Sequence, residues 1–173
     1  MAQGQRESDN RSMIPRGDIA SWLQAIHERA TAGYAVALHL GHHAPRYLFQ
    51  TFPRAWSAAY ADEGLVFLDP TAAWGMAHVG RVAWADLAAR DHAGVLARAA
   101  EHGLRFGLAV AVLRGGSRTV ASLARADRAF SPEEGEAIEA AVIALHDATR
   151  EGAGLDPGQE EALRRLSVAF SRP

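Results

Sequence analysis

Several features are missing from this sequence, and each absence narrows what the protein can be. None of its 173 residues is cysteine, which excludes disulfides and thiolate metal sites and fits a reducing compartment. The 18 basic and 20 acidic residues nearly balance, so a basic nucleic-acid surface is not indicated. No apolar run reaches the length of a membrane span, and the polar start lacks the apolar segment of a signal peptide. We therefore expect a cytoplasmic protein without a membrane partner.

Motifs for catalysis and metal binding are missing as well. The chain has no G-x-S-x-G elbow, no H-E-x-x-H pair and no glycine-rich loop that would cradle a phosphate. Of its 8 histidines, His42 and His43 are adjacent in an expected turn, where neighbouring side chains point apart. The remaining histidines show no metal-ligand spacing. We expect no enzyme activity, no metal and no cofactor.

The sequence does contain the periodic patterns of one folded domain. Near the start, Ile19, Trp22, Leu23 and Ile26 form a single apolar stripe on a helix that begins at Asp18. Residues 131–134 read Ser-Pro-Glu-Glu, a capping box that opens a second long amphipathic helix. We expect helices near 18–33, 52–60, 91–102, 131–150 and 156–170, a short helix that begins at residue 70, strands at 34–40, 46–50, 105–113 and 118–124, and an irregular link at 80–84. This order predicts an antiparallel sheet with helices packed on its faces.

The strand predicted at 105–113 has two unlike faces. Phe106, Leu108, Val110 and Val112 point one way, while Gly107, Ala109 and Ala111 point the other. A face reduced to glycine and alanine leaves room for a ligand. It is equally typical of close packing between a helix and a sheet, so both interpretations stay open.

Residues 52–84 hold three of the four tryptophans. Phe52, Trp56 and Tyr60 recur every four residues, so on a helix they share one face. Asp69 precedes a proline and is placed to cap a helix. Such a cluster is typical of a core helix with aromatic anchors, but it also suits a ligand with a polar head and an apolar tail.

The pattern W-x3-Y-x8-D-P, followed later by Trp84, resembles the autoinducer-binding domain of LuxR-type quorum-sensing regulators. The matching residues are Trp56, Tyr60, Asp69 and Pro70, and the resemblance extends over about 33–150, including a glycine at 107. It implies an α/β/α sandwich with a central antiparallel sheet and helices on both faces. It also implies a ligand, an N-acyl homoserine lactone, between the sheet and one helical layer.

The resemblance assigns a role to each matching residue. The Trp56 indole N–H would donate to the lactone carbonyl, and Asp69 would accept the ligand amide N–H. The Tyr60 hydroxyl would donate to the acyl carbonyl, and Trp84 would form an apolar wall. Each residue also has a structural alternative: Asp69 could simply cap its helix, and the aromatic residues could belong to the core.

Two more positions belong to the predicted site. Ser122 lies on the last predicted strand, where many family members place a hydroxyl that reaches the acyl carbonyl. Phe52 stands where some members have tyrosine, so one polar contact to the ligand is expected to be missing. We therefore expect ligand binding itself to be kept, with the finer ligand preference left open.

The resemblance also bears on domains and partners. Family members carry a C-terminal helix-turn-helix domain, and residues 155–170 resemble only its first helix. We expect a flexible tail at 1–17, the autoinducer-binding domain at 18–150, and a linker with a remnant helix of the DNA-binding domain at 151–173. The expected protein binds autoinducer, does not bind DNA specifically, and forms homodimers or heterodimers with a full-length relative.

Two alternatives to this function stay open: a ligand-free dimerisation module, and, least favoured, a small-molecule enzyme on a similar sandwich. For a dimer contact, the small residues Ala137, Ala140 and Ala144 would let a second helix approach closely. They are also simply good helix formers.

Overall fold

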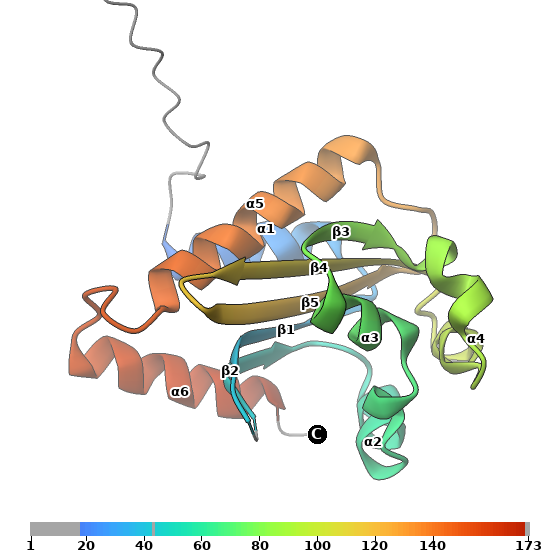
Figure 1. The fold of residues 1–173 in the computed structure, drawn as a ribbon, viewed down its shortest axis with the longest axis horizontal. Coiled ribbons are helices and arrows are strands. Elements are labelled where there is room, and N and C mark those ends of the chain that lie inside the picture. Colours follow the sequence, from blue (N-terminus) through green and yellow to red (C-terminus); the bar gives the residue numbers. More distant parts are fainter. Residues whose placement is uncertain (1–17, 43, 172–173) are drawn as a thin grey trace, which may run out of the picture.

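A computed structural model describes residues 18–42 and 44–171, the last four by their backbone alone (Figure 1). The expected tail at 1–17 lies outside the described residues. Along the chain the elements are α1 (Ile19–Arg29), β1 (Gly33–Leu40), β2 (Pro45–Gln50), α2 (Arg54–Asp62), the short 3-10 helix η1 (Leu65–Phe67), α3 (Pro70–Ala77), β3 (Gly80–Ala83), the 3-10 helix η2 (Trp84–Arg90), α4 (Val95–Glu101), β4 (Phe106–Arg114), β5 (Ser117–Arg125), α5 (Pro132–Thr149) and α6 (Pro157–Ser171).

The strands form one antiparallel sheet in the order β2-β1-β5-β4-β3. Helices α1 and α5 lie together on one side of it, and α2, α3 and α4 lie on the other (Figure 1). The predicted sandwich with helices on both faces is confirmed. The sheet has five strands rather than the four predicted.

The additional strand, β3, corrects the irregular link expected at 80–84. Val82 pairs with Ala109 and Gly80 with Ala111, so β3 is the edge strand next to β4. Four residues that begin with glycine carry too little alternation to indicate a strand by themselves. Their conformation depends on β4, which offers the hydrogen bonds.

The face of the sheet under α1 and α5 holds the larger core. Side chains from every second position of the central strands meet the apolar stripe of α5 there, and all are buried. The alternation predicted for residues 105–113 is confirmed from Leu108 onward, because Leu108, Val110 and Val112 join this core while Ala109 faces the other side. Phe106, at the start of β4, is 39% exposed and does not join the core. We call this side the core face.

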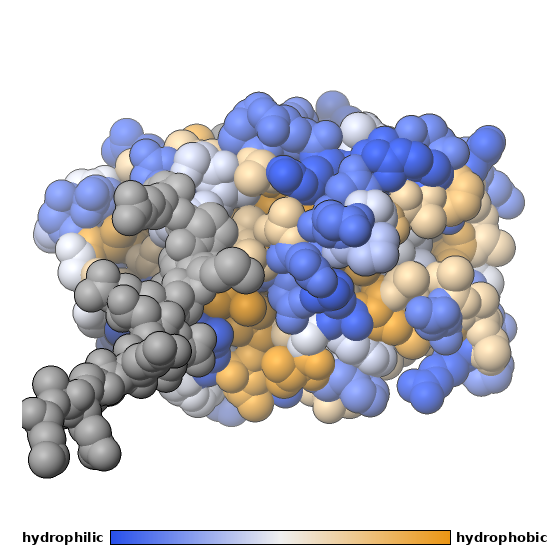
Figure 2. Space-filling model, turned by 90° about the horizontal axis from the view of Figure 1, so that it is seen from above, coloured by the Kyte–Doolittle hydropathy of each residue, from blue (hydrophilic) through white to orange (hydrophobic). Residues whose placement is uncertain are grey.

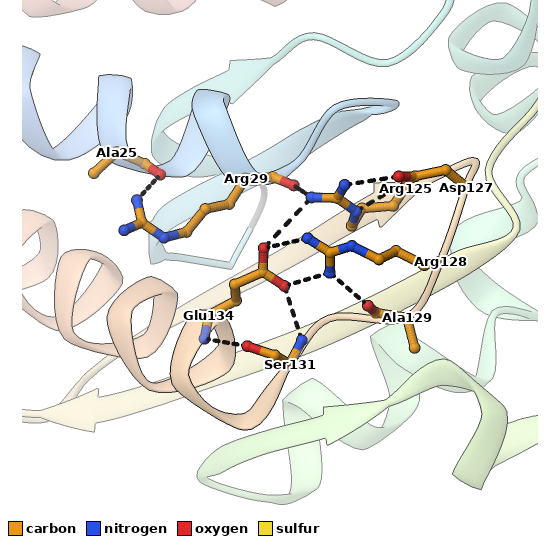
Figure 3. A network of polar contacts seen from close by, with 8 residues as sticks. All are labelled: Ala25, Arg29, Arg125, Asp127, Arg128, Ala129, Ser131 and Glu134. Atoms are coloured by element: carbon orange, nitrogen blue, oxygen red, sulfur yellow. Dashed lines mark hydrogen bonds and ion pairs between the residues drawn. The ribbon is translucent and has the colours of Figure 1, made fainter.

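A buried arginine joins the ends of three elements on the core face (Figure 3). Arg125, at the end of β5, donates to the Arg29 carbonyl at the end of α1 at 3.0 Å and forms an ion pair with Asp127. The predicted capping box of α5 is present, and hydrogen bonds from Arg128 and the Ser131 backbone lower the pKa of Glu134 to about 2. The network fixes where α5 starts relative to α1.

Helix α6 packs against β2 at the edge of the sheet. The Ser167 hydroxyl accepts the Leu48 backbone N–H at 2.8 Å and donates to the Leu48 carbonyl at 3.1 Å. Leu163 is only 5% exposed and belongs to the core, whereas Leu166 is 45% exposed. Part of the apolar stripe of α6 is therefore covered by its own domain. The Phe170 side chain lies outside the described residues.

The small residues expected to form a dimer contact on α5 are not all available. Ala144 is 1% exposed within the single chain, so its proposed place in a dimer contact is wrong. Ala137 and Ala140 are half-buried. Helix α1 packs beside α5 and occupies part of its surface. Separately, no helix in the described ranges combines the length and apolar character that crossing a membrane requires.

Candidate functional site

A cavity of about 550 Å³ lies on the other face of the sheet, beneath α2, η1, α3 and α4. All the residues that the sequence predicted for the site line this one cavity. They come from five separate segments of the chain: Phe52, Trp56, Tyr60, Asp69, Trp84 and Ser122. We call this side of the sheet the pocket face.

The floor of the cavity consists of small side chains on the central strands. Ala35 pairs with Ser122 across β1 and β5, and Ala37 pairs with Val120. On β2, Gln50 and Leu48 continue the same two rows, opposite Ala35 and Ala37. Because alanine and serine rise little above a sheet, the layer of helices above them leaves open volume.

Glycines allow two close contacts at the border of this floor. A Cβ atom on Gly107 would lie 1.8 Å from Cδ2 of Trp84, and one on Gly75 of α3 would lie 2.5 Å from Cγ1 of Val120. The indole of Trp84 and helix α3 therefore rest directly on the sheet. Both interpretations of the small-residue face hold, since it admits close packing at these two points and a cavity between them.

Asp69 forms the polar end of the cavity. As the N-cap of α3, its Oδ1 accepts the Thr71 backbone N–H at 2.7 Å, and its Oδ2 accepts the Tyr60 hydroxyl at 2.7 Å. Asp69 is 8% exposed. Burial, then the charge and hydrogen bond of Asp69, raise the pKa of Tyr60, so Tyr60 keeps its proton. Asp69 thus serves as a helix cap and as a pocket acceptor at once.

The indoles of Trp56 and Trp84, which also line the cavity, are nearly enclosed. The Trp56 ring lies 5.6 Å from the ring centroids of both Tyr60 and His102. The Trp84 N–H is buried, without an acceptor in the described part of the chain. Since buried N–H groups normally have partners, the Trp84 N–H is an unused donor on a residue that lines the cavity.

Sequence reasoning missed several residues that line the cavity. Gln50 and Ser57 form a hydrogen-bonded pair in its wall, and Thr71 lies beside Asp69. The alternation of side chains along the strand predicted at 46–50 could have indicated that Gln50 faces the cavity. Ser57 and Thr71 follow the predicted residues closely, but nothing in their spacing separates them from surface residues.

The mouth of the cavity is apolar and exposed. Val66 and Phe67 of η1 and Met76 of α3 line it, and Phe67 is 89% exposed. These side chains and the small floor give the cavity a mostly apolar lining away from Asp69. In the described ranges, no three histidine, aspartate or glutamate side chains gather closely enough to hold a metal ion.

Comparison with known families and structures matches this architecture. The family model described as the autoinducer binding domain matches residues 23–149. A comparison with curated protein sequences gave no match.

Solved structures with the same fold share little sequence with this chain. SdiA of Escherichia coli is 16% identical with a TM-score of 0.56, over 83% of this chain and 66% of that one. SdiA in complex with octanoyl-rac-glycerol is 16% identical with a TM-score of 0.57, over 92% and 73%. CepR2 of Burkholderia cenocepacia, an N-acylhomoserine lactone dependent LuxR family factor, is 17% identical with a TM-score of 0.51, over 78% and 96%. At these identities the matches show the fold.

Proposed function

The chain belongs to the autoinducer-binding domain family of LuxR-type regulators, and from this premise we propose that its cavity binds an N-acyl homoserine lactone. This is a family of ligand-binding regulatory domains and not of enzymes. One observation carries the proposal: an apolar cavity of about 550 Å³ ends in a cluster of the buried Trp56 and Asp69 with the half-buried Tyr60. A polar head on an apolar acyl tail matches that division.

The head of the ligand would meet the Asp69 carboxylate. A carboxylate offers roughly four lone-pair sites, and Thr71 and Tyr60 occupy two of them. The ligand amide N–H would donate to a remaining site, a charge-assisted bond that is strong in a nearly dry pocket. This bond would fix the position of the amide.

Carbonyl oxygens on either side of the amide would meet the neighbouring donors. Trp56 would donate to the lactone carbonyl, and Ser122 and Tyr60 would donate to the acyl carbonyl. The Tyr60 hydroxyl donates to Asp69 in this structure, so its O–H must rotate away from Asp69 to donate to the acyl carbonyl. Trp84 would form the apolar wall, and its buried N–H would gain an acceptor if a ligand oxygen approached it.

The tail would lie over the small residues of the floor, between Leu48 of β2 and Met76 of α3. The ligands of two structural neighbours support this class of ligand. CepR2 depends on an N-acylhomoserine lactone, and SdiA forms a complex with octanoyl-rac-glycerol. Both ligands carry an acyl chain.

Thermal unfolding of the purified chain tests the proposal. A lactone present at one hundred times its Kd adds about 2.7 kcal/mol to the free energy of unfolding. Asp69→Asn keeps an oxygen that can cap α3 but loses the charge, so the ligand-induced rise in Tm should shrink by the equivalent of about 1–3 kcal/mol. No rise with N-butanoyl, N-octanoyl or N-dodecanoyl homoserine lactone would refute the proposal and favour the ligand-free dimerisation module.

We propose further that this 173-residue chain senses or sequesters the ligand without reading DNA itself. Helix α6 supports this, because it is folded onto β2 with Leu163 in the core and is not presented as a separate DNA-reading element. A footprint on a palindromic promoter duplex that persists at raised salt would contradict it, since non-specific contacts weaken steeply with salt.

Regulation would then act through pairing with a second copy or with a full-length relative. Helix α5 lies at the top of the molecule in Figure 1. Seen from that side, the surface has both apolar and hydrophilic areas (Figure 2). On α5 the half-buried Ala137 and Ala140 remain as small contact residues. Sedimentation of Ala140→Arg against the unchanged chain tests whether this face contributes to a dimer.

A further inference from the structure

The alternation of side chains along β1 between the two faces of the sheet reverses before the strand ends. Ala35 and Ala37 line the cavity, while Val36 and Leu38 are buried in the core. By the same alternation His39 should face the cavity and Leu40 the core. Instead, Leu40 lines the cavity together with Pro45, its partner on β2.

The reversal occurs at His39, whose backbone has a φ of 56°. It is the one positive-φ residue other than glycine among the described positions. A left-handed conformation is uncommon for a residue with a side chain and persists only where the surroundings hold it. The consequence is that the next residue, Leu40, turns onto the pocket face.

The His39 side chain is held at both ring nitrogens. Its Nδ1 lies 2.8 Å from the Ser117 hydroxyl and its Nε2 lies 2.9 Å from the Thr149 hydroxyl. The backbone N–H of His39 donates to the Thr119 hydroxyl at 3.2 Å. Its ring also lies 4.5 Å from the ring of His146 on α5.

The hydrogen-bond directions in this cluster are determined. The Thr149 hydroxyl donates its single hydrogen to the Leu145 carbonyl at 2.7 Å, so it accepts from His39 Nε2–H. Nδ1 of the neutral ring then accepts from Ser117. The ring is therefore fixed between β5 and α5 with every polar atom matched.

We propose that His39 is a positioning residue for the tail end of the cavity: its left-handed backbone places Leu40 in the cavity wall, and its bonds to Ser117 and Thr149 hold that conformation. The proposal rests on the proposed function, because the tail is that of the acyl ligand. Its consequence is dependence on acyl length, since only a long tail reaches Leu40.

Calorimetric titration with N-butanoyl, N-octanoyl and N-dodecanoyl homoserine lactone tests it. His39→Val introduces a β-branched residue that disfavours positive φ, so affinity for the dodecanoyl compound should fall about tenfold through loss of the leucine contact. Affinity for the butanoyl compound should stay unchanged. His39→Gly, which accepts the left-handed conformation freely, should keep most of the affinity for the long chain.

Two further variants keep the test decisive. Leu40→Ala removes the same contact directly and should reproduce the length-dependent loss even if His39→Val does not fold. His92→Val, at an exposed histidine, is the matched control and should change nothing. Equal losses for all three lactones in His39→Val, or no length dependence in Leu40→Ala, would overturn the inference. An unchanged chain that binds none of the lactones would instead refute the proposed function.

Discussion

The two faces of the sheet are built from the same strands but differ in how they are filled. On the core face, Val36, Leu38 and Val110 are completely buried against α1 and α5. On the pocket face, Ala35, Ala37 and their neighbours leave a cavity of about 550 Å³. Strands β1, β2 and β5 therefore place one half of their side chains in the core and the other half toward the cavity.

This difference predicts that the same kind of substitution affects stability on one face and ligand affinity on the other. A change on the core face removes or overfills packed volume, so it changes the free energy of unfolding. A change on the pocket face alters empty space, so it changes ligand affinity and leaves stability nearly intact.

Truncating a core-face leucine should have the largest effect. Leu145 of α5 is completely buried, and Leu145→Ala should lower the free energy of unfolding by about 2–5 kcal/mol. Leu96→Ala is the matched variant on the pocket face, where the leucine is half-buried beside the cavity. It should cost less than about 1.5 kcal/mol in urea denaturation; equal losses would contradict the comparison.

One substitution made on both faces sharpens the contrast. Ala121 is completely buried in the core, whereas Ala37 lines the cavity. Ala121→Phe should therefore destabilise by about 1–3 kcal/mol or more. Ala37→Phe should change stability by less than about 1 kcal/mol and abolish the ligand-induced rise in Tm. A stable Ala121→Phe variant would show that the core face is less tightly packed than described.

A smaller effect is expected from acidification at the end of the core face. Burial, then the charges of His146 and Arg46, lower the pKa of His39 from 6.5 to about 4, while Asp147 opposes this. Burial likewise lowers the pKa of His146. The hydrogen bond to the Arg114 carbonyl and the charge of Asp147 oppose this shift, and the charges of Arg114 and Arg150 reinforce it. Below 6.5 the unfolded chain takes up protons that the folded chain does not, so stability falls as the pH drops from about 6.5 to about 4.

The loss should amount to about 1 kcal/mol, because His39 is only half-buried and solvent weakens the effect. Urea denaturation at about pH 7 and about pH 5 measures this loss. Both pH values lie above the range in which most carboxylates are protonated. His39→Asn, which also tolerates positive φ, is the control and should show a smaller change between the two conditions.

Elements whose side-chain pattern repeats over many residues could be predicted from the sequence. Conformations that depend on contacts between residues distant in the sequence could not. The helix after Ser131 and the alternating strand at 105–113 follow from local patterns. Strand β3 depends on pairing with β4, and the reversal at His39 depends on Ser117 and Thr149, which are far away in sequence.

The candidate site shows the same division. A resemblance in residue spacing indicated Trp56, Tyr60 and Asp69, and the structure places them together. The shape of the cavity could not be predicted, because it depends on which residues of β1, β2 and β5 share a face. Gln50 and Ser57 belong to the wall for that reason.

Isothermal titration of the purified chain with N-octanoyl homoserine lactone tests the central claim most directly. The account predicts saturable binding of one ligand per chain, strongly weakened in Asp69→Asn and absent in Ala37→Phe although that variant stays folded. Binding that Ala37→Phe leaves unchanged would place the ligand outside the cavity. No saturable heat with any of the three lactones would contradict the account.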